Sequence, residues 1–319
     1  MWAGPLENRQ LKIDNQIGPM VRRRHYSFFD ESFLSRLERL RLLSKRLSTR
    51  SSPGQRRSRR LGDGLEFADH RDYVSGDDIR FIDWPYYARM ERLLLRLFHE
   101  HSEADVMVLL DVSASMAAGG DMAKFDFGRR VAAALAYVAM ASLERVIVQP
   151  FAGELGAELR TGRNRDQIFR VLEFLDSLRP GGPTALERCS TLLGRRRERP
   201  GTLILISDLM ECQDELAAAA MRLRQACGEC VVLQVYSPGD AEPALSGSMR
   251  MEAAEGPGGL TLTVDAAVLE AYRGRWAEFG SACERTCVRC GLTYASACSD
   301  LPFDRLVLQT LRRCGVLTG

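Results

Sequence analysis

The feature that most constrains this fold is a series of short apolar runs that alternate with amphipathic stretches from residue 105 onward. The runs are DVMVLLD at 105–111, RVIVQPFA at 145–152, TLILIS at 202–207 and CVVLQVYS at 230–237. Continuous apolar runs of this length are typical of strands buried on both faces. The intervening stretches carry apolar residues three or four positions apart, as amphipathic helices do. The pattern predicts βαβ units and a mostly parallel sheet covered by helices on both faces.

The remaining segments of this region complete the same pattern. A helix with Val131, Leu135, Val138 and Ser142 on one stripe follows the first strand. Further helices are expected at 164–178, 185–196, 211–226, about 265–290 and 302–314. GAELRT is expected as an edge strand, LTYASA as a last strand and residues 247–263 as a hairpin. The predicted fold class is α/β: a three-layer, Rossmann-like domain with a small helical and β region before it.

The first hundred residues divide differently. Residues 31–47 have apolar residues at helical spacing and predict an amphipathic helix, and a basic linker follows at about 48–62. LEFADH, IRFIDW and RLLLRLFHEH are strand candidates. We therefore expect an N-terminal helix and linker at 1–62, a small β-rich region at 63–104 and the α/β domain at 105–319, with a β-hairpin insertion at about 240–263.

Charge and composition exclude some classes of protein. The formal net charge is +2 over 319 residues, and ten basic residues with one acid lie between Arg36 and Arg60. Only three of the 44 basic residues are lysines, a skew that indicates base composition of the genome and not a phosphate-binding surface. We therefore expect no nucleic-acid partner.

Targeting and redox signals favour the cytoplasm. The chain has no run of 18 apolar residues, and its polar N-terminus lacks the apolar core of a signal peptide, so no membrane insertion is expected. The nine cysteines are odd in number and all lie beyond residue 188, which argues against a disulfide framework covering the molecule. A reducing compartment, and hence a cytoplasmic location, is the expectation.

Oxygen-bearing side chains follow the predicted strands. Asp111, Ser113 and Ser115 come after the first apolar run, and Asp208 follows TLILIS. Thr184 precedes the helix expected at 185–196. Because ligands of open α/β sheets bind beyond the carboxyl ends of the strands, these loops are expected to share one edge of the sheet.

This residue set has a definite chemistry. Alternate residues of an extended segment point the same way, so Asp111, Ser113 and Ser115 can converge on one ion. Carboxylate and hydroxyl oxygens, with no His or Cys, suit a hard divalent cation: we expect Mg²⁺, with Mn²⁺ and Ca²⁺ as alternatives. A turn with a helix cap is the simpler alternative, because Ser and Asp are common at both.

The region resembles a von Willebrand factor A-type domain. Asp111, Ser113, Ser115, Thr184 and Asp208 match the metal-ion-dependent adhesion site of that family position by position. One departure is Pro183, directly before Thr184, where the family more usually has GGT. The resemblance implies a bound cation with an open position that an Asp or Glu of a partner protein fills.

The segment from 64 to 116 narrows the resemblance to the bacterial domain-of-unknown-function 58 family. The residues that carry it are Gly64, Glu66, Phe67, Asp69, Arg71, Tyr73, Gly76, Asp77, Asp78, Arg80, Asp83, Trp84, Ala88 and Arg89. The likeness extends from about residue 29 to LPFDRLVLQTLRRCGVL near the end of the chain. It implies an adaptor beside a MoxR-type AAA+ ATPase, in complex assembly, maturation or metal insertion, with a client or partner protein offering the Asp or Glu.

Two enzymatic alternatives stay open. A serine nucleophile at Ser113 or Ser115 needs a base, and all four histidines lie before residue 102. A metal-dependent hydrolase could use the same Asp, Ser and Thr set for phosphoryl chemistry, but no phosphate-binding glycine loop accompanies it. We expect a binding module and keep the hydrolase as the alternative.

Cysteine and histidine pairs elsewhere have simpler explanations than metal or redox chemistry. Cys283, Cys287 and Cys290 continue the apolar stripe of the helix expected at 265–290 and are interpreted as core residues. CGEC at 227–230 follows its helix, unlike a redox motif, and is interpreted as incidental pairing or packing, with a zinc site as the remaining alternative. His99 and His101 share one face of a predicted strand, which is expected to be simply polar.

The block ADHRDYVSGDDIRFIDW alternates acids and arginines and has two interpretations. It is either a structural ion-pair network or a docking surface for the ATPase or a client. The residues concerned are Asp69, Arg71, Asp77, Asp78, Arg80, Asp83, Trp84 and Arg89.

Overall fold

The structure, a computed structural model, describes most of the chain. The described residues are 32, 33, 35–37, 39, 61–74, 77–99, 105–118, 123–162, 164–255 and 259–313; within 61–69, 97–99, 123, 165 and 311–313 only the backbone is described. The linker expected at 48–62 therefore lies outside the described residues up to residue 60, as does almost all of the basic segment 36–60.

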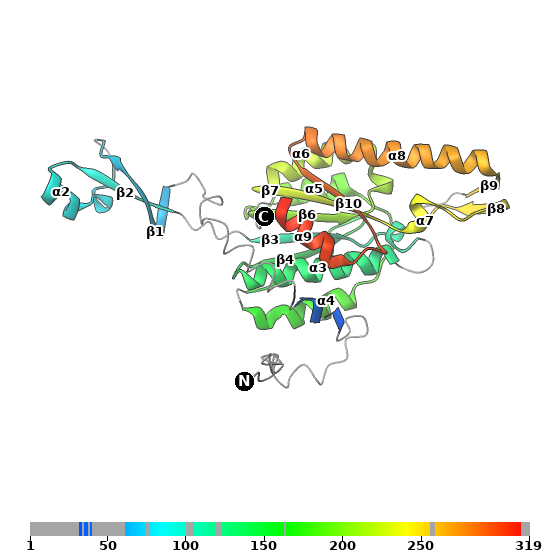
Figure 1. The fold of residues 1–319 in the computed structure, drawn as a ribbon, viewed down its shortest axis with the longest axis horizontal. Coiled ribbons are helices and arrows are strands. Elements are labelled where there is room, and N and C mark those ends of the chain that lie inside the picture. Colours follow the sequence, from blue (N-terminus) through cyan, green and yellow to red (C-terminus); the bar gives the residue numbers. More distant parts are fainter. Residues whose placement is uncertain are drawn as a thin grey trace, which may run out of the picture.

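A six-stranded sheet forms the centre of the molecule (Figure 1). Its strands are β3 (Val106–Asp111), β4 (Val146–Phe151), β5 (Leu159–Arg160), β6 (Thr202–Ser207), β7 (Glu229–Tyr236) and β10 (Thr293–Cys298). They are arranged in the order β10-β7-β6-β3-β4-β5, and all neighbours are parallel except β5, which pairs antiparallel with β4 at the edge. The predicted α/β fold class is confirmed by this topology.

Helices cover both faces of this sheet, giving three layers (Figure 1). On one face lie α3 (Ala123–Ala141), α4 (Ile168–Ser177) and α9 (Phe303–Arg313). On the other lie α5 (Leu186–Gly194), α6 (Leu216–Ala226) and α8 (Ala266–Arg289). Each follows the spacing of apolar residues in the sequence, and each of the helices predicted for this region is present.

Strand β3 shows why two helical layers are needed. All six of its residues are buried. Val108 and Leu110 belong to the core beneath α3, whereas Met107 and Leu109 belong to the core beneath α5 and α6. Successive side chains of a strand point to opposite faces, so a strand without polar alternation is stable only between two apolar layers.

The described part of the N-terminal helix packs against this domain. Residues 32, 33, 35–37 and 39 are helical, in agreement with the helix predicted at 31–47 as far as it is described. Phe33 and Leu37 are buried, and the Phe33 ring lies 4.9 Å from the Phe303 ring of α9. The buried aromatic contact fixes this helix on the α3 and α9 side of the sheet.

A small unit precedes the α/β domain and is drawn at the left of Figure 1. It consists of the antiparallel strands β1 (Leu61–Asp72) and β2 (Leu94–His99), the 3-10 helix η2 (Ile79–Phe81) and the helix α2 (Trp84–Met90). The strand predicted over IRFIDW is wrong: Asp78 caps η2, and Asp83 caps α2 with Pro85 in its first turn. Caps and an N-terminal proline favour helix over strand.

A hairpin lies between β7 and α8, as predicted. After the short helix α7 (Pro238–Ala241), which the sequence analysis missed, β8 (Gly247–Glu252) pairs antiparallel with β9 (Gly259–Val264). Figure 1 places this hairpin next to α7. Residues 253–255 of its connecting turn are described, and they matter for the site.

Candidate functional site

The strand order places a topological switch point beside β3. The chain runs from β3 to β4 and β5 on one side, then crosses over to β6, β7 and β10 on the other. Crossovers therefore leave β3 and β6 in opposite directions, and ligands bind at such a switch point in open α/β sheets. Asp111 is the last residue of β3, and Ser207 and Asp208 are the last residue of β6 and the next one.

The first loop folds around the carboxylate of Asp111. The Ser113 backbone N–H donates to Asp111 Oδ1 at 2.8 Å, which reverses the chain directly after the strand. Ser113 precedes the 3-10 helix η3 (Ala114–Ala117), but its hydroxyl makes no capping bond there. Its hydroxyl instead lies 3.0 Å from that of Ser115. A helix cap alone therefore does not account for the D-x-S-x-S pattern.

The third loop brings a second carboxylate to the first. The Ser207 hydroxyl donates to Asp111 Oδ2 at 2.6 Å, and the Ser115 hydroxyl donates to Asp208 Oδ1 at 3.3 Å. Asp111 and Ser113 are 0% exposed, Ser115 3% and Asp208 1%. Four of the five predicted site residues thus meet in one buried cluster.

The second loop is tied to the first by its backbone. The Ala114 N–H donates to the Gly182 carbonyl at 2.9 Å, and the Gly181 N–H donates to the Val112 carbonyl at 2.8 Å. Gly182 has φ +80, a conformation that favours glycine, which explains the glycine in this loop. Thr184 follows at the half-buried rim, so the extra proline before it does not remove it from the sheet edge.

A carboxylate from the hairpin turn reaches this rim. Glu255 Oε2 accepts from the Thr184 N–H at 2.5 Å, and Glu255 Oε1 accepts from the Thr184 hydroxyl at 2.7 Å. Glu255 Oε1 also accepts from the Ser115 N–H at 3.3 Å. The hydrogen bonds described for Thr184 therefore run to Glu255, which links the first loop to the second.

A buried ammonium lies on the other side of Asp208. Lys124, in the first turn of α3, is 1% exposed, and its Nζ lies 2.9 Å from Asp208 Oδ2 and 3.4 Å from Asp240 Oδ2. Asp240 is held by the capping box of α7 with Ser237. The α7 segment thus brings a further carboxylate to the sheet edge.

The cluster carries more negative than positive charge. Four carboxylates, those of Asp111, Asp208, Asp240 and Glu255, gather here. Lys124 forms ion pairs with two of them, Asp208 and Asp240. Burial, and then the charge of Asp208, raise the pKa of Asp111 to about 7, although bonds from Ser113 and Ser207 oppose the shift. Two close carboxylates without full compensation stabilise a bound cation.

The donor set fits a hard divalent cation. Carboxylate and hydroxyl oxygens from separate loops lie within hydrogen-bond distance of one another, as ligands of Mg²⁺ would. In the described part of the chain, no group of three or more His, Cys, Asp and Glu side chains is arranged to hold a metal ion. The predicted site offers two aspartates and depends on hydroxyls for the rest.

Sequence reasoning missed four of the residues in this cluster: Ser207, Lys124, Asp240 and Glu255. Ser207 is the last residue of β6 and Asp240 lies in α7, directly after β7, so the same strand-end rule could have found them. Lys124 had a weaker signal, as one of three lysines in the chain. Glu255 had none, because a turn residue of a hairpin carries no information about what the hairpin approaches.

The cysteines are packed in the core, as interpreted from the sequence. Cys283 and Cys287 are buried on one face of α8 beside Leu292 and Tyr294, and Cys290 packs against the same cluster. Burial raises the pKa of Cys283 to about 11 and that of Cys287 to about 12, so both are neutral thiols.

The CGEC segment is explained by close packing of its backbone. Cys227 and Cys230 are buried in the same core. A Cβ on Gly228 would lie 2.6 Å from the Gly201 carbonyl oxygen, so only glycine fits at position 228. Both thiols therefore pack in the core, and a hydrogen bond with Cys230 lowers the pKa of Cys227. The histidine pair lies outside the described residues, because the side chain of His99 and the whole of His101 are not described.

The charged block of the small unit forms local pairs. Arg71 bonds to Asp77 at 2.6 Å and Arg80 to Asp78 at 2.6 Å, and His70 lies 2.8 Å from Asp83. These partners lower the pKa values of the three aspartates through hydrogen bonding.

Three further residues of this block differ in their surroundings. Arg89 donates to the Pro85 carbonyl at 3.2 Å. Trp84 is 55% exposed, and the side chain of Asp69 is not described. The ion pairs support the interpretation of this block as a structural network. Docking of the ATPase or a client stays a prediction, for which the exposed Trp84 offers an apolar contact.

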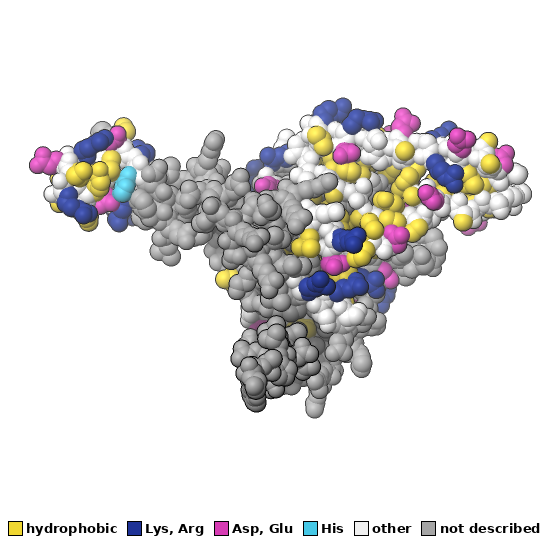
Figure 2. Space-filling view, viewed as in Figure 1, with side chains coloured by type: hydrophobic (Ala, Val, Ile, Leu, Met, Phe, Trp, Pro, Cys, Tyr) yellow, Lys and Arg dark blue, Asp and Glu magenta, His cyan; other side chains and the backbone are white. Residues whose placement is uncertain are grey.

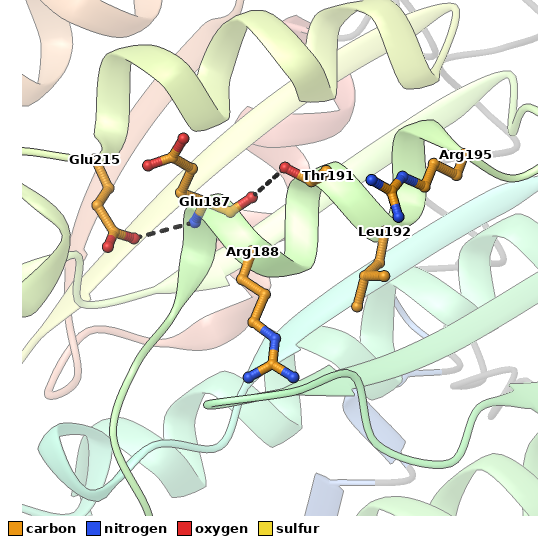
Figure 3. Close-up of a pocket in the computed structure, with 6 residues that line it drawn as sticks. All are labelled: Glu187, Arg188, Thr191, Leu192, Arg195 and Glu215. Carbon is orange, nitrogen blue, oxygen red and sulfur yellow. Dashed lines mark hydrogen bonds between the residues drawn. The ribbon is translucent and has the colours of Figure 1, made fainter.

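A surface hollow lies away from this cluster. A depression of about 430 Å³ on the outer side of α5 and the start of α6 is lined by Glu187, Arg188, Thr191, Leu192, Arg195 and Glu215 (Figure 3). Its polar groups already pair internally, with the Glu187 N–H donating to Glu215 at 3.1 Å and the Thr191 hydroxyl donating to the Glu187 carbonyl at 2.9 Å. None of the five predicted site residues lines it.

The described helices include none with the length and apolar character needed to cross a bilayer.

Figure 2 shows basic and acidic side chains interspersed over the visible face of the α/β domain, in keeping with the small net charge.

Solved structures with a similar arrangement include several bacterial proteins. The conserved hypothetical protein BatB from Bacteroides thetaiotaomicron matches with a TM-score of 0.42 and 17% identity, covering 66% of this chain and 98% of that one. An aerotolerance-related membrane protein from Bacteroides fragilis gives a TM-score of 0.40 at 17% identity, covering 66% and 99%. The scores are low, and the fold is assigned here from strand order and layers.

Relatives by sequence are uncharacterized proteins of mycobacteria. The uncharacterized proteins Rv1480 of Mycobacterium tuberculosis and Mb1516 of Mycobacterium bovis are each 26% identical over 267 residues, covering 81% of this chain and 83% of theirs. The model of the family described as "Protein of unknown function DUF58" matches residues 69–282, which include the whole oxygen cluster. The chain therefore belongs to the DUF58 family, as its sequence motifs predicted.

Proposed function

We propose that this protein is a cation-dependent protein-recognition module and that a MoxR-type AAA+ ATPase is its partner. The observation that carries the proposal is the cluster in which four carboxylates, from two strand-end loops, α7 and the hairpin turn, outnumber the single described ammonium. Its oxygen-only donors suit Mg²⁺, with Mn²⁺ or Ca²⁺ as alternatives. The partner class comes from the sequence resemblance, and a cytoplasmic location belongs to the same proposal.

The residues of the cluster have distinct roles in this proposal. Asp111, Ser113 and Ser115 supply the first loop of ligands, Thr184 the second and Asp208 the third. Bound Mg²⁺ supplies an electrophilic position that an Asp or Glu of a client or of the ATPase can fill. Ser207 holds one oxygen of Asp111 and so orients the other. Lys124 balances part of the charge of Asp208.

A pulldown with the MoxR-type ATPase tests this function. Wild type is compared with Asp111→Asn in Mg²⁺ and in EDTA, and Asp105→Asn is the matched control. Asp105 lies just before the opposite end of β3, where it pairs with Arg145 at 2.7 Å. We expect wild type and Asp105→Asn to retain the ATPase in Mg²⁺ only, and Asp111→Asn to lose it in both conditions.

Binding that ignores both EDTA and Asp111→Asn would contradict the proposed function for this partner. The alternative, a hydrolase that uses the same residues, predicts turnover of a phosphoester substrate that stops in Asp111→Asn. Such turnover would replace recognition by catalysis as the function of this site.

A further inference from the structure

We propose that Glu255 is the site's own carboxylate ligand, and that a partner must displace it to bind. This inference rests on the proposed function, because it concerns how an outside carboxylate reaches the same oxygen cluster. It adds a residue that neither the family resemblance nor the strand-end rule identifies.

The contacts of Glu255 are those that an outside carboxylate would make. Both of its oxygens are engaged: Oε2 by the Thr184 N–H at 2.5 Å, and Oε1 by the Thr184 hydroxyl at 2.7 Å and the Ser115 N–H at 3.3 Å. Ser115 and Thr184 come from two different loops of the predicted metal site. A carboxylate that bridges them lies where a carboxylate approaching the cation would have to lie.

Burial of the cluster supports the same conclusion. Asp111, Ser113, Ser115 and Asp208 are at most 3% exposed, whereas Thr184 and Glu255 are half-buried. Glu255 and Thr184 therefore form the solvent side of the cluster. In this proposal, an outside Asp or Glu reaches a cation held by the inner oxygens only after Glu255 leaves this position.

The hairpin that carries Glu255 is suited to move. Nearly all side chains of β8 and β9 are exposed, and Val264, at the end of β9, is the buried one. An isolated two-stranded hairpin is marginally stable in water, so releasing its turn from the domain disturbs little core. Met251 and Leu260 pair across the strands and are 43% and 63% exposed, which leaves an apolar surface beside the turn.

The hairpin is nevertheless anchored close to the site at its base. It begins after α7, where Asp240 contacts Lys124 at 3.4 Å, and it ends at Asp265, the N-cap of α8. The Tyr272 hydroxyl of α8 donates to the Asp240 carbonyl at 2.7 Å. The turn is thus a tethered competitor of the partner's carboxylate. The apparent affinity for the partner equals the intrinsic affinity multiplied by the fraction of molecules in which the turn is released.

The first test measures the contact without a partner. Amide hydrogen exchange of segments 113–118 and 181–185 is compared in wild type, Glu255→Ala, Glu255→Gln and Glu252→Gln, each in Mg²⁺ and in EDTA. Glu252 is the control because it lies in the same hairpin with its side chain 76% exposed and paired with Arg250. We expect exchange at both segments to rise severalfold in Glu255→Ala, less in Glu255→Gln and not in Glu252→Gln. Unchanged exchange in Glu255→Ala would overturn the proposal.

The second test measures displacement. In Mg²⁺, Glu255→Ala is expected to bind the MoxR-type ATPase on the order of tenfold more tightly than wild type or Glu252→Gln. If Glu255→Ala binds the ATPase no more tightly than wild type does, while Asp111→Asn still fails to bind, the proposed role of Glu255 is overturned. The proposed function then remains. Absence of binding by every variant would contradict the proposed function, and the exchange experiment would then decide the Glu255 contact by itself.

Discussion

The oxygen cluster at the sheet edge and the charged block of the β1–β2 unit are both built around aspartates, but their partners lie at different distances in sequence. In the cluster, Ser115 and Asp208 meet across 93 positions, and Asp111 and Ser207 across 96. In the small unit, Arg80 pairs with Asp78 two positions away, and Arg71 with Asp77 six positions away.

Burial separates the two regions in the same way. The side chains of Lys124 and Asp208 are 0% and 2% exposed, whereas those of Arg80 and Asp78 are 80% and 40% exposed. A buried charge depends on its partner, while an exposed pair contributes little because water replaces the partner. Charge pairs between residues close in sequence therefore shape a turn, whereas pairs created by the topology form a site.

The largest expected effect is at the buried ion pair. Lys124→Met leaves Asp208 and Asp240 without their ammonium, and breaking a buried pair from one side costs about 3–5 kcal/mol. We expect a matching fall in the free energy of unfolding, measured by urea denaturation in EDTA. Arg80→Met, at the exposed pair, is the control and should leave the midpoint unchanged. Similar midpoints for both variants would remove the distinction between the two regions.

A smaller loss is expected at the hydroxyl that links the two carboxylate loops. The Ser207 hydroxyl donates to Asp111 at 2.6 Å and accepts from the Leu209 N–H at 3.0 Å. Ser207→Ala leaves both groups unsatisfied in a buried place, which costs about 1–3 kcal/mol. Denaturation of Ser177→Ala gives the comparison, because that hydroxyl is exposed and bonds only within its own helix turn. Equal stabilities would show that Ser207 is not part of a buried network.

The pH dependence of stability should come from the cluster. The pKa of Asp111 is raised to about 7 from 3.8, so the folded state holds this proton more tightly than the unfolded state does. Asp111 therefore favours folding at low pH, and that contribution is lost as pH rises from about 4 to about 7. Compared with Asp111→Asn in EDTA, wild type should lose stability between about pH 4 and about pH 7. Parallel profiles of the two proteins would contradict the shift.

The smallest effect on the whole molecule is expected in the small unit. Asp83 caps α2 through the Tyr86 N–H at 2.9 Å and pairs with His70 at 2.8 Å. Asp83→Ala should raise amide exchange in α2 and leave the unfolding midpoint of the α/β domain unchanged, because these bonds are local. A fall in that midpoint would mean that the unit stabilises the larger domain.

Much of the fold was predictable because its signal is periodic. Apolar runs and helical spacing located every strand of the central sheet, and the carboxyl ends of β3 and β6 located Asp111 and Asp208. The strand predicted over IRFIDW was wrong, since its alternation of apolar residues was outweighed by the caps Asp78 and Asp83.

The rest of the site depends on approach in three dimensions. Glu255 reaches Thr184 from 71 positions away, and Lys124 reaches Asp208 from 84 positions away. No local pattern marks a turn glutamate or a helix lysine as part of a sheet edge. Their roles follow only once strand order and the position of the hairpin are known.

Isothermal titration of Mg²⁺ into the wild-type chain, Asp111→Asn and Asp105→Asn measures directly whether this edge of the sheet binds a cation. Wild type and Asp105→Asn are predicted to bind one Mg²⁺ per chain, and Asp111→Asn is predicted to bind none. Wild type that takes up no Mg²⁺, Mn²⁺ or Ca²⁺, or Asp111→Asn that binds as wild type does, would contradict a cation site at this edge of the sheet.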